Sequence, residues 1–203
     1  RVLLNFKIDL LKVALTKKAL LLNIPENDVL SMVELIHHIS LKEHLHILNL
    51  QTPIATQEIG ISLFGINQLF TMTNPSHETP KEPLLEKLNQ KGTLFIKNIH
   101  FLDLESQNNL ANFIRYGFYK ILKSERKIFS DVRIICSTNQ NLEHLTKEGL
   151  FSENLLRELR NTALTLPTLL TLPVNETCAV AATLATAMMA AIVNFFIISF
   201  QKV

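Results

Sequence analysis

This 203-residue sequence has few glycines, only two cysteines and a small net charge, and each of these features narrows the possible functions. Only five glycines occur, and between Ala19 and Leu41 there is neither a glycine nor a lysine, so this stretch cannot supply a glycine-rich phosphate-binding loop with its lysine. The two cysteines, Cys136 and Cys178, lie far apart, so we expect no disulfide and a reducing, cytoplasmic compartment. A net charge of +2, with no basic block longer than two residues, gives no argument for nucleic acid.

The apolar residues predict an α/β fold. They make up 47% of the sequence, which is enough for a sizeable core. Continuous apolar and β-branched runs at 93–96 and 132–136 are typical of strands buried on both faces of a parallel sheet. The segment between them has apolar residues at helical spacing from Leu104 to Leu122. Strand, helix and strand in this order form a crossover, so we predict a three-layer α/β/α parallel sheet.

Polar residues follow both predicted strands, at 97–100 and at 137–139. Ligands of open α/β sheets bind beyond the carboxyl ends of the strands, so we expect any site at this edge. Upstream, the sequence predicts a strand at 19–22, a loop, and a helix that Asn27 or Asp28 caps. Strand, loop and helix in this order have the placement of a phosphate-binding loop.

Four sequence blocks carry a resemblance to a known family. GTLFI at 92–96 is followed by DVRII at 131–135, by STN at 137–139, and by GLF at 149–151 with LPTL at 166–169. In this order and spacing they resemble the AAA+ sigma-54 interaction domain of bacterial enhancer-binding transcription activators, the NtrC-like family. The resemblance covers about residues 10–170 and implies a core similar to P-loop NTPases, with the family's helical lid mostly absent. We expect the core to comprise residues 1–170 and a separate apolar tail to comprise residues 171–203.

The resemblance also locates the nucleotide site, and the residues found there do not suit a nucleotide. The family's G-E-S-G-T-G-K-E loop places its glycines at Asn23, Glu26 and Asp28 and its lysine at Val29. The Asp-Glu pair that orders Mg²⁺ and the attacking water falls on Lys97 and Asn98. ATP and Mg²⁺ are therefore implied by resemblance only, and the replacements predict that this chain uses neither and has no catalytic residue.

The family's arginine fingers and sensor also map onto this chain. The fingers fall on Ser152 and Glu158, and Arg157 and Arg160 lie beside them as alternatives. Asn139 matches the sensor asparagine and is the one position in this set that keeps its residue type. Because the other residues of that site are replaced, we interpret Asn139 as a turn asparagine at the end of a strand.

The loop with which the family grips the sigma factor, G-A-F-T-G-A, corresponds to a segment that includes Leu69, Phe70 and Thr71. Phe70 and Thr71 match the central F-T, but both glycine positions are lost. Glycines let such a loop fold back sharply, so we do not expect this chain to remodel sigma-54. Two interpretations remain: Phe70 contacts sigma-54 passively, or Phe70 packs against its own domain.

We expect structural roles for two other groups of polar residues, the histidines at 37–46 and the acidic residues near 104. His37, His38, His44 and His46 lack a His-Glu-x-x-His pattern and a nearby cysteine pair, so we expect solvated or hydrogen-bonded histidines and no metal. The acidic residues at 103 and 105 suit the start of a helix.

The C-terminal tail differs in composition from the rest of the chain. No charged residue occurs from Thr177 to Gln201, and residues 178–200 are long enough to cross a bilayer as a helix. Three interpretations stay open: a membrane anchor that would make the protein membrane-associated, a buried helix, or an end produced by a shifted reading frame or truncated gene.

Our leading hypothesis is a degenerate sigma-54-activator-type domain that regulates transcription or oligomerises without hydrolysing ATP. The resemblance implies sigma-54 RNA polymerase and further copies of the chain as partners. The alternatives are an active ATPase of the family and a membrane-tethered binding protein. No helix-turn-helix follows the core, so we expect no direct DNA binding.

Overall fold

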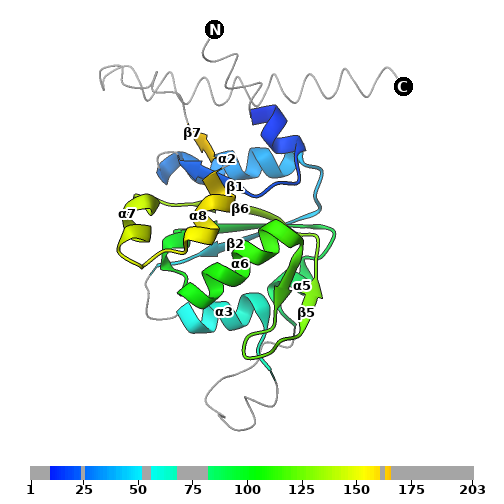
Figure 1. Ribbon diagram of the computed structural model, residues 1–203. Helices are drawn as coiled ribbons and strands as arrows, with labels where there is room; N and C mark the ends of the chain where they lie inside the picture. Colours follow the sequence, from blue (N-terminus) through cyan, green and yellow to red (C-terminus); the bar gives the residue numbers. More distant parts are fainter. Residues whose placement is uncertain (1–9, 24–25, 52–55, 68–81, 161–162, 166–203) are drawn as a thin grey trace, which may run out of the picture. The chain divides into compact units, whose positions relative to one another are not determined.

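The computed structural model describes residues 10–23, 26–51, 56–67, 82–160 and 163–165, all within the unit Arg1–Leu166 (Figure 1). Residues 10–15 are helical. The elements that follow are β1 (Leu20–Asn23), α2 (Glu26–Ile39), β2 (His44–Asn49), α3 (Thr56–Phe64), α5 (Leu84–Lys87), β3 (Gly92–Lys97), a 3-10 turn (Ile99–Phe101), α6 (Leu104–Tyr116), β4 (Phe118–Lys120), β5 (Lys127–Phe129), β6 (Arg133–Ser137), α7 (Leu142–Lys147), α8 (Glu153–Arg160) and β7 (Ala163–Thr165).

Five parallel strands form the central sheet in the order β2-β3-β6-β1-β7. Leu94 of β3 lies opposite Ile134 of β6, and Leu21 of β1 lies opposite Cys136. The predicted α/β fold with a parallel sheet is confirmed. The predicted strand boundaries agree with the observed ones to within one residue, because all three predicted strands are continuous apolar runs.

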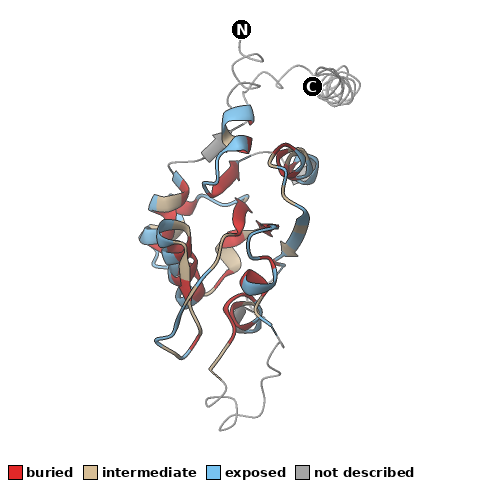
Figure 2. Ribbon diagram, turned by 90° about the vertical axis from the view of Figure 1, so that its right-hand side faces the viewer, coloured by how far each residue is buried: buried red, intermediate tan, exposed pale blue. Residues whose placement is uncertain are grey.

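Helices cover both faces of the sheet (Figures 1 and 2). Successive residues of a strand point to opposite faces, so each strand contributes to two cores. Leu20, Leu22 and Phe95 pack with the buried side of α2 and with the helical turn at 10–15. Leu94 and Cys136 pack on the other face with α3, α5, α6 and α8. This arrangement is the predicted three-layer sandwich.

The crossover helix is shorter than predicted. α6 ends at Tyr116, and Gly117 follows in the left-handed conformation with φ 72°. The Gly117 N–H donates to the Phe113 carbonyl at 2.9 Å, which closes the last turn. The prediction that helical spacing continues to Leu122 was wrong, because the chain turns at Gly117 into the antiparallel hairpin β4–β5.

β7 was not predicted from the sequence. It has three residues and pairs with β1 at the edge of the sheet, where Leu164 lies opposite Leu22. So short a segment shows no periodicity that would distinguish a strand from a loop.

Among the helices that the structure describes, none is long and apolar enough to cross a membrane. The apolar segment 178–200 and the region of the family's helical lid lie outside the described residues.

Candidate functional site

The carboxyl ends of the parallel strands form the candidate site. β1, β3 and β6 end at Asn23, Lys97 and Ser137, and Lys97 lies directly opposite Ser137. After β1 the chain crosses to β2 at one side of the sheet, whereas after β6 it crosses to β7 at the other side. Ligands of open α/β sheets bind beyond the carboxyl ends of neighbouring strands whose connections run in opposite directions. The prediction that the residues after β3 and β6 meet at one edge is confirmed.

The connection between β1 and α2 is too short for a phosphate-binding loop. β1 ends at the exposed Asn23 and α2 begins at Glu26, which leaves two residues between strand and helix. A glycine-rich loop that cradles phosphates needs about six residues there. Val29, at the family's lysine position, is only 4% exposed and packs with Val33 in the core. A side chain at this position of the helix points into the protein and away from a ligand.

The predicted cap of α2 was wrong, because the helix begins before both Asn27 and Asp28. Pro25 directly precedes the helix in the sequence. Asp28 is exposed in the first turn, where a carboxylate suits the positive end of the helix dipole. A carboxylate at this end would repel a phosphate.

The end of β3 carries no carboxylate that could hold Mg²⁺. Lys97 and Asn98 are the two residues at which the resemblance places the family's acidic pair, and both are half-buried. Asn98 is left-handed, with φ 58° and ψ 49°, a conformation that asparagine tolerates better than most residues. Its Nδ2 donates to the Leu50 carbonyl at 3.0 Å. Asn98 therefore turns the chain from β3 into the 3-10 segment and ties that turn to the end of β2.

His100 and Thr138 connect the segments that follow β3 and β6. His100 Nδ1 lies 2.8 Å from Thr138 Oγ1, which also accepts from the Gln140 N–H at 3.1 Å. Burial lowers the pKa of His100, so its imidazole is neutral at neutral pH. Asn139, at the family's sensor position, is exposed in the bend after β6. The contact between His100 and Thr138 was not predicted from the sequence. The polar residues that follow both strands in the sequence were the feature that could have indicated it.

Ser152, at the first arginine-finger position, is buried and caps α8. Its N–H donates to Gln107 Oε1 at 2.7 Å, and its hydroxyl donates to Asn108 Oδ1 at 2.6 Å. The same hydroxyl accepts from the Leu155 N–H at 3.4 Å, the bond typical of a helix N-cap. This buried position therefore joins α8 to α6.

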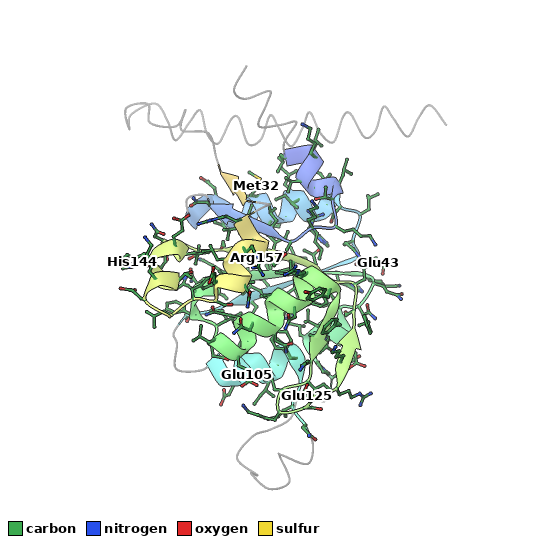
Figure 3. The ribbon with its side chains drawn as sticks, viewed as in Figure 1. Met32, Glu43, Glu105, Glu125, His144 and Arg157 are labelled. Atoms are coloured by element: carbon green, nitrogen blue, oxygen red, sulfur yellow. The ribbon has the colours of Figure 1, made fainter. Side chains whose placement is uncertain are left out.

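Glu158, at the second finger position, is half-buried on α8 between two arginines. Its carboxylate lies 3.9 Å from Arg115 and 3.7 Å from Arg157. A carboxylate cannot stabilise the negative charge of a phosphate. The side chains of Arg157, which Figure 3 labels, and Arg160 are more than half exposed. Arg160 donates to Glu143 at 2.6 Å.

Two parts of the predicted site lie outside the described residues. Leu69, Phe70 and Thr71 fall within 68–81, and the tail falls within 166–203. Passive contact with sigma-54 and attachment to a membrane therefore stay predictions.

The histidines near α2 and β2 make bonds within the domain or are exposed. His37 Nδ1 lies 3.1 Å from Thr93 Oγ1, and His38 Nδ1 lies 2.6 Å from a backbone carbonyl one turn earlier. His44 and His46 are exposed and lie two residues apart in β2, on one face of the strand. Within the described ranges, no three His, Cys, Asp or Glu side chains gather as a metal site would require.

Comparison with known families and proteins shows consistent similarity. Residues 30–165 match the Sigma-54 interaction domain. The chain is 36% identical over 80 residues to the DNA-binding transcriptional regulator NtrC of Azospirillum brasilense, covering 39% of this chain and 17% of that protein. It is 34% identical over 105 residues to the alginate biosynthesis transcriptional regulatory protein AlgB of Pseudomonas syringae pv. tomato, covering 51% and 23%. The chain thus spans less than a quarter of the length of these curated relatives.

Solved structures share the fold at lower sequence identity. NtrX from Brucella abortus in complex with ATP has a TM-score of 0.63 and 24% identity, over 83% of this chain and 37% of that one. The P-loop NTPase domain of the sigma-54 transport activator from E. coli has a TM-score of 0.53 and 14% identity, over 80% and 94%. Both similarities support an AAA+ P-loop NTPase-like fold.

Proposed function

Because this chain belongs to the sigma-54 interaction domain family, we propose that it acts in transcription regulation as a module that assembles with other subunits and does not hydrolyse ATP. Its partners would be copies of itself or active members of the family, together with sigma-54 RNA polymerase. The domain keeps the apolar framework of the fold, so it would present its helices and strands to neighbouring subunits as the family does. The residues that would act on a nucleotide are replaced.

The observation that carries this proposal is the two-residue connection between β1 and α2. Phosphate binding in this fold depends on several consecutive backbone N–H groups that wrap around the anion, and a loop of this length cannot wrap. The replacement of the acidic pair by Lys97 and Asn98, and the burial of Ser152, support the same conclusion.

Nucleotide titration tests the proposal directly. The full chain is titrated with Mg-ATP, and both the heat and the melting temperature are followed, with NtrX from Brucella abortus as the positive control. A ligand that binds only the folded state stabilises it by about 2.7 kcal/mol at one hundred times its Kd. We expect neither heat nor a shift up to millimolar ATP. A micromolar affinity would contradict the proposal.

A double variant distinguishes the effect of the short loop on ATP binding from the effect of the missing acidic pair. Lys97→Asp combined with Asn98→Glu restores the family's residues at the end of β3. We expect this variant still to bind no Mg-ATP, because the connection between β1 and α2 stays short. If the two substitutions produce ATP binding, the acidic pair and not the loop is the cause of the loss.

Mixing with an active family member tests the regulatory role. In the family, arginine fingers act on the phosphate of a neighbouring subunit, so a subunit with Ser152 and Glu158 in their place would leave its neighbour's site incomplete. We expect the ATPase activity of an active partner to fall as the proportion of this chain rises, and the two chains to sediment together. Unchanged activity with separate sedimentation would exclude assembly.

A further inference from the structure

Aromatic side chains lie exposed around the β4–β5 hairpin. Tyr116, at the end of α6, is 54% exposed and Phe129 of β5 is 72% exposed. The rings of Tyr116 and Phe118 stack with centroids 5.7 Å apart and planes 17° apart, and Phe118 meets Phe129 edge to face at 5.8 Å. We call these three rings the aromatic strip. The exposed rings of Tyr116 and Phe129, joined by the half-buried Phe118, form an aromatic surface of the kind that marks a site of interaction.

The aromatic strip is surrounded by positive charge. Lys127 Nζ lies 4.7 Å from the Phe118 centroid, and Arg115 Cζ lies 5.2 Å from the ring of the adjacent tyrosine. Lys120 lies directly opposite Lys127, although like charges at opposed positions destabilise a hairpin. Residues 115–129 contain five basic residues and one acidic residue, which is more positive charge than the net +2 of the whole chain. This concentration of charge fits a polyanion.

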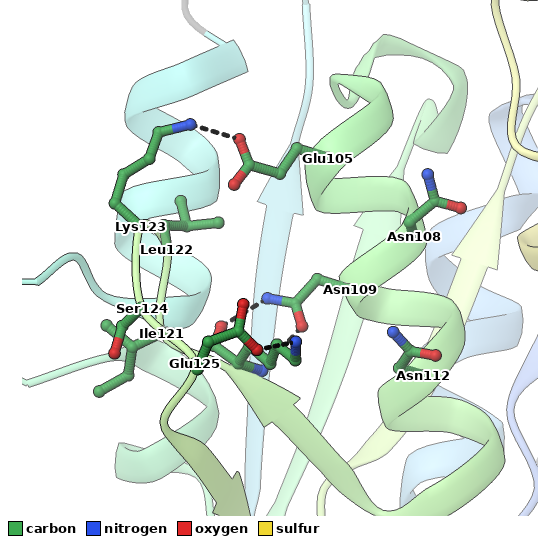
Figure 4. Close-up of a pocket in the computed structure, with 10 residues that line it drawn as sticks. Glu105, Asn108, Asn109, Asn112, Ile121, Leu122, Lys123, Ser124 and Glu125 are labelled. Atoms are coloured by element: carbon green, nitrogen blue, oxygen red, sulfur yellow. Dashed lines mark hydrogen bonds and ion pairs between the residues drawn. The ribbon is translucent and has the colours of Figure 1, made fainter.

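A pocket of about 580 Å³ opens between α6 and the hairpin (Figure 4). Asn109 holds the two elements together, because its Nδ2 donates to the Lys120 carbonyl at 2.6 Å and its Oδ1 accepts from the Lys120 N–H at 2.8 Å. Asn112 also lines the pocket and is exposed, and its side-chain amide makes no hydrogen bond to the described part of the chain. It lies one helical turn before Tyr116, so this amide and the aromatic strip belong to one surface.

The two carboxylates at the pocket are already paired. Glu105 lies 2.8 Å from Lys123 Nζ, and Glu125 pairs with Lys120 (Figure 4). These pairs neutralise the negative charge beside the hairpin. Lys127 and Arg126, which are exposed on the same hairpin, remain for an anionic ligand.

We propose that this surface binds single-stranded nucleic acid. Bases stack on Tyr116 and Phe129, phosphates contact Lys127 and Arg126, and Asn112 bonds to the edge of a base. A single strand offers flat apolar faces together with negative charge, which is the combination that exposed rings and cations recognise. An acidic protein segment offers the charge without the flat faces, and a duplex keeps its bases stacked inside. This mode needs no helix-turn-helix, and none of its residues belongs to the family's nucleotide site.

Fluorescence anisotropy of the full chain tests the proposal in the absence of ATP. The probes are labelled oligothymidylate and oligouridylate of about 16 nucleotides, the upper site size of a comparable single-strand-binding fold. A duplex of the same length and polyglutamate serve as competitors. We expect both single strands to bind more tightly than the duplex, and polyglutamate to compete poorly. The ratio of the two single-strand affinities distinguishes DNA from RNA as the preferred ligand.

Phe129→Ala and its matched control Leu15→Ala separate base stacking from general loss of apolar surface. Leu15 is 71% exposed and lies in the helical turn at 10–15, which packs on the opposite face of the sheet. We expect Phe129→Ala to weaken binding about 5- to 150-fold, the range for the loss of one stacked base, and Leu15→Ala to leave the affinity unchanged. Equal melting temperatures of the variants confirm that the fold is intact.

Lys127→Gln, with the exposed Lys147→Gln on α7 as control, tests the phosphate contact. We expect Lys127→Gln alone to reduce the slope of log affinity against log salt by about 0.7. The proposal is overturned if neither oligonucleotide binds, if polyglutamate competes as well as a single strand, or if Phe129→Ala binds like the unmodified chain.

Discussion

The interior of the sheet and its carboxyl edge differ in what they share with the family. In the interior, the strands carry the apolar residues of the family's motifs, and Phe95 and Ile135 are almost fully buried. At the edge, the resemblance predicts nucleotide-binding positions at residues such as Asn98 and Ser152, whose hydrogen bonds serve the turns and helix starts of this chain. The interior therefore carries the fold that the chain shares with the family, whereas ATP hydrolysis depends on edge residues that can be replaced while that fold is kept.

Removing an interior ring should have the largest effect. Phe95 is 1% exposed and packs between Ile135 and the helices on one face of the sheet. We expect Phe95→Ala to lower the free energy of unfolding by about 3–5 kcal/mol, since it leaves a cavity. Urea denaturation of the full chain measures the loss. Phe129→Ala makes the same chemical change at an exposed site and should cost less than about 1 kcal/mol. Equal losses at the two sites would contradict the burial described here.

Ser152→Ala should show that an edge position has become part of the fold. We expect a loss of about 1–2 kcal/mol, because the helix cap and the bond to Asn108 both disappear. Asn141→Ala removes the exposed cap of α7, which accepts from two backbone N–H groups, and should cost about 0.5–1 kcal/mol. The measurement is again urea denaturation. A neutral Ser152→Ala would mean that this position is not structural.

The buried His37 should make the free energy of unfolding depend on pH. Burial, followed by the charges of His38, Arg133 and His44, lowers the pKa of His37 in the folded state. Above the unfolded pKa of about 6.5 both states are neutral, and as the pH falls below it the unfolded state takes up a proton first, so stability decreases. We expect His37→Gln to lose less stability than the unmodified chain between about pH 7.5 and about pH 5.5.

The exposed His144→Gln is the control for this measurement. Some pH dependence should remain in His37→Gln, because burial also lowers the pKa of His100. Identical losses of stability in His37→Gln and the unmodified chain, measured by urea denaturation at both pH values, would show that His37 is not the group responsible.

A surface ion pair near the edge should matter least. Arg160 and Glu143 are 2.6 Å apart, but both side chains are about 60% exposed. We expect Arg160→Ala to cost about 0.2–1 kcal/mol, with the loss shrinking at high salt. A double-mutant cycle with Glu143→Ala isolates the pair. A coupling energy well above this range would show that the edge still contains a strong electrostatic interaction.

Several features could be predicted because they depend on local sequence. Continuous apolar runs located β3 and β6, and the polar residues after them identified the edge at which Lys97 and Ser137 meet. The end of α6 could not be placed, because the apolar spacing continues past Gly117 into the hairpin. The positive charge at 115–129 was also missed. It can be counted in the sequence, but only the pairing of β4 with β5 places Lys120 opposite Lys127.

The sequence by itself determined the parallel sheet and the lack of any glycine or lysine between Ala19 and Leu41. Strand propensity is a property of short segments, and no folding can supply a missing glycine or lysine. Only the tertiary structure decided which polar groups meet. Arg133 donates to the Val13 carbonyl 120 residues away, and Gln107 accepts from the Ser152 backbone 45 residues away. Such bonds depend on the packing that brings distant segments together, and no periodicity along the chain encodes them.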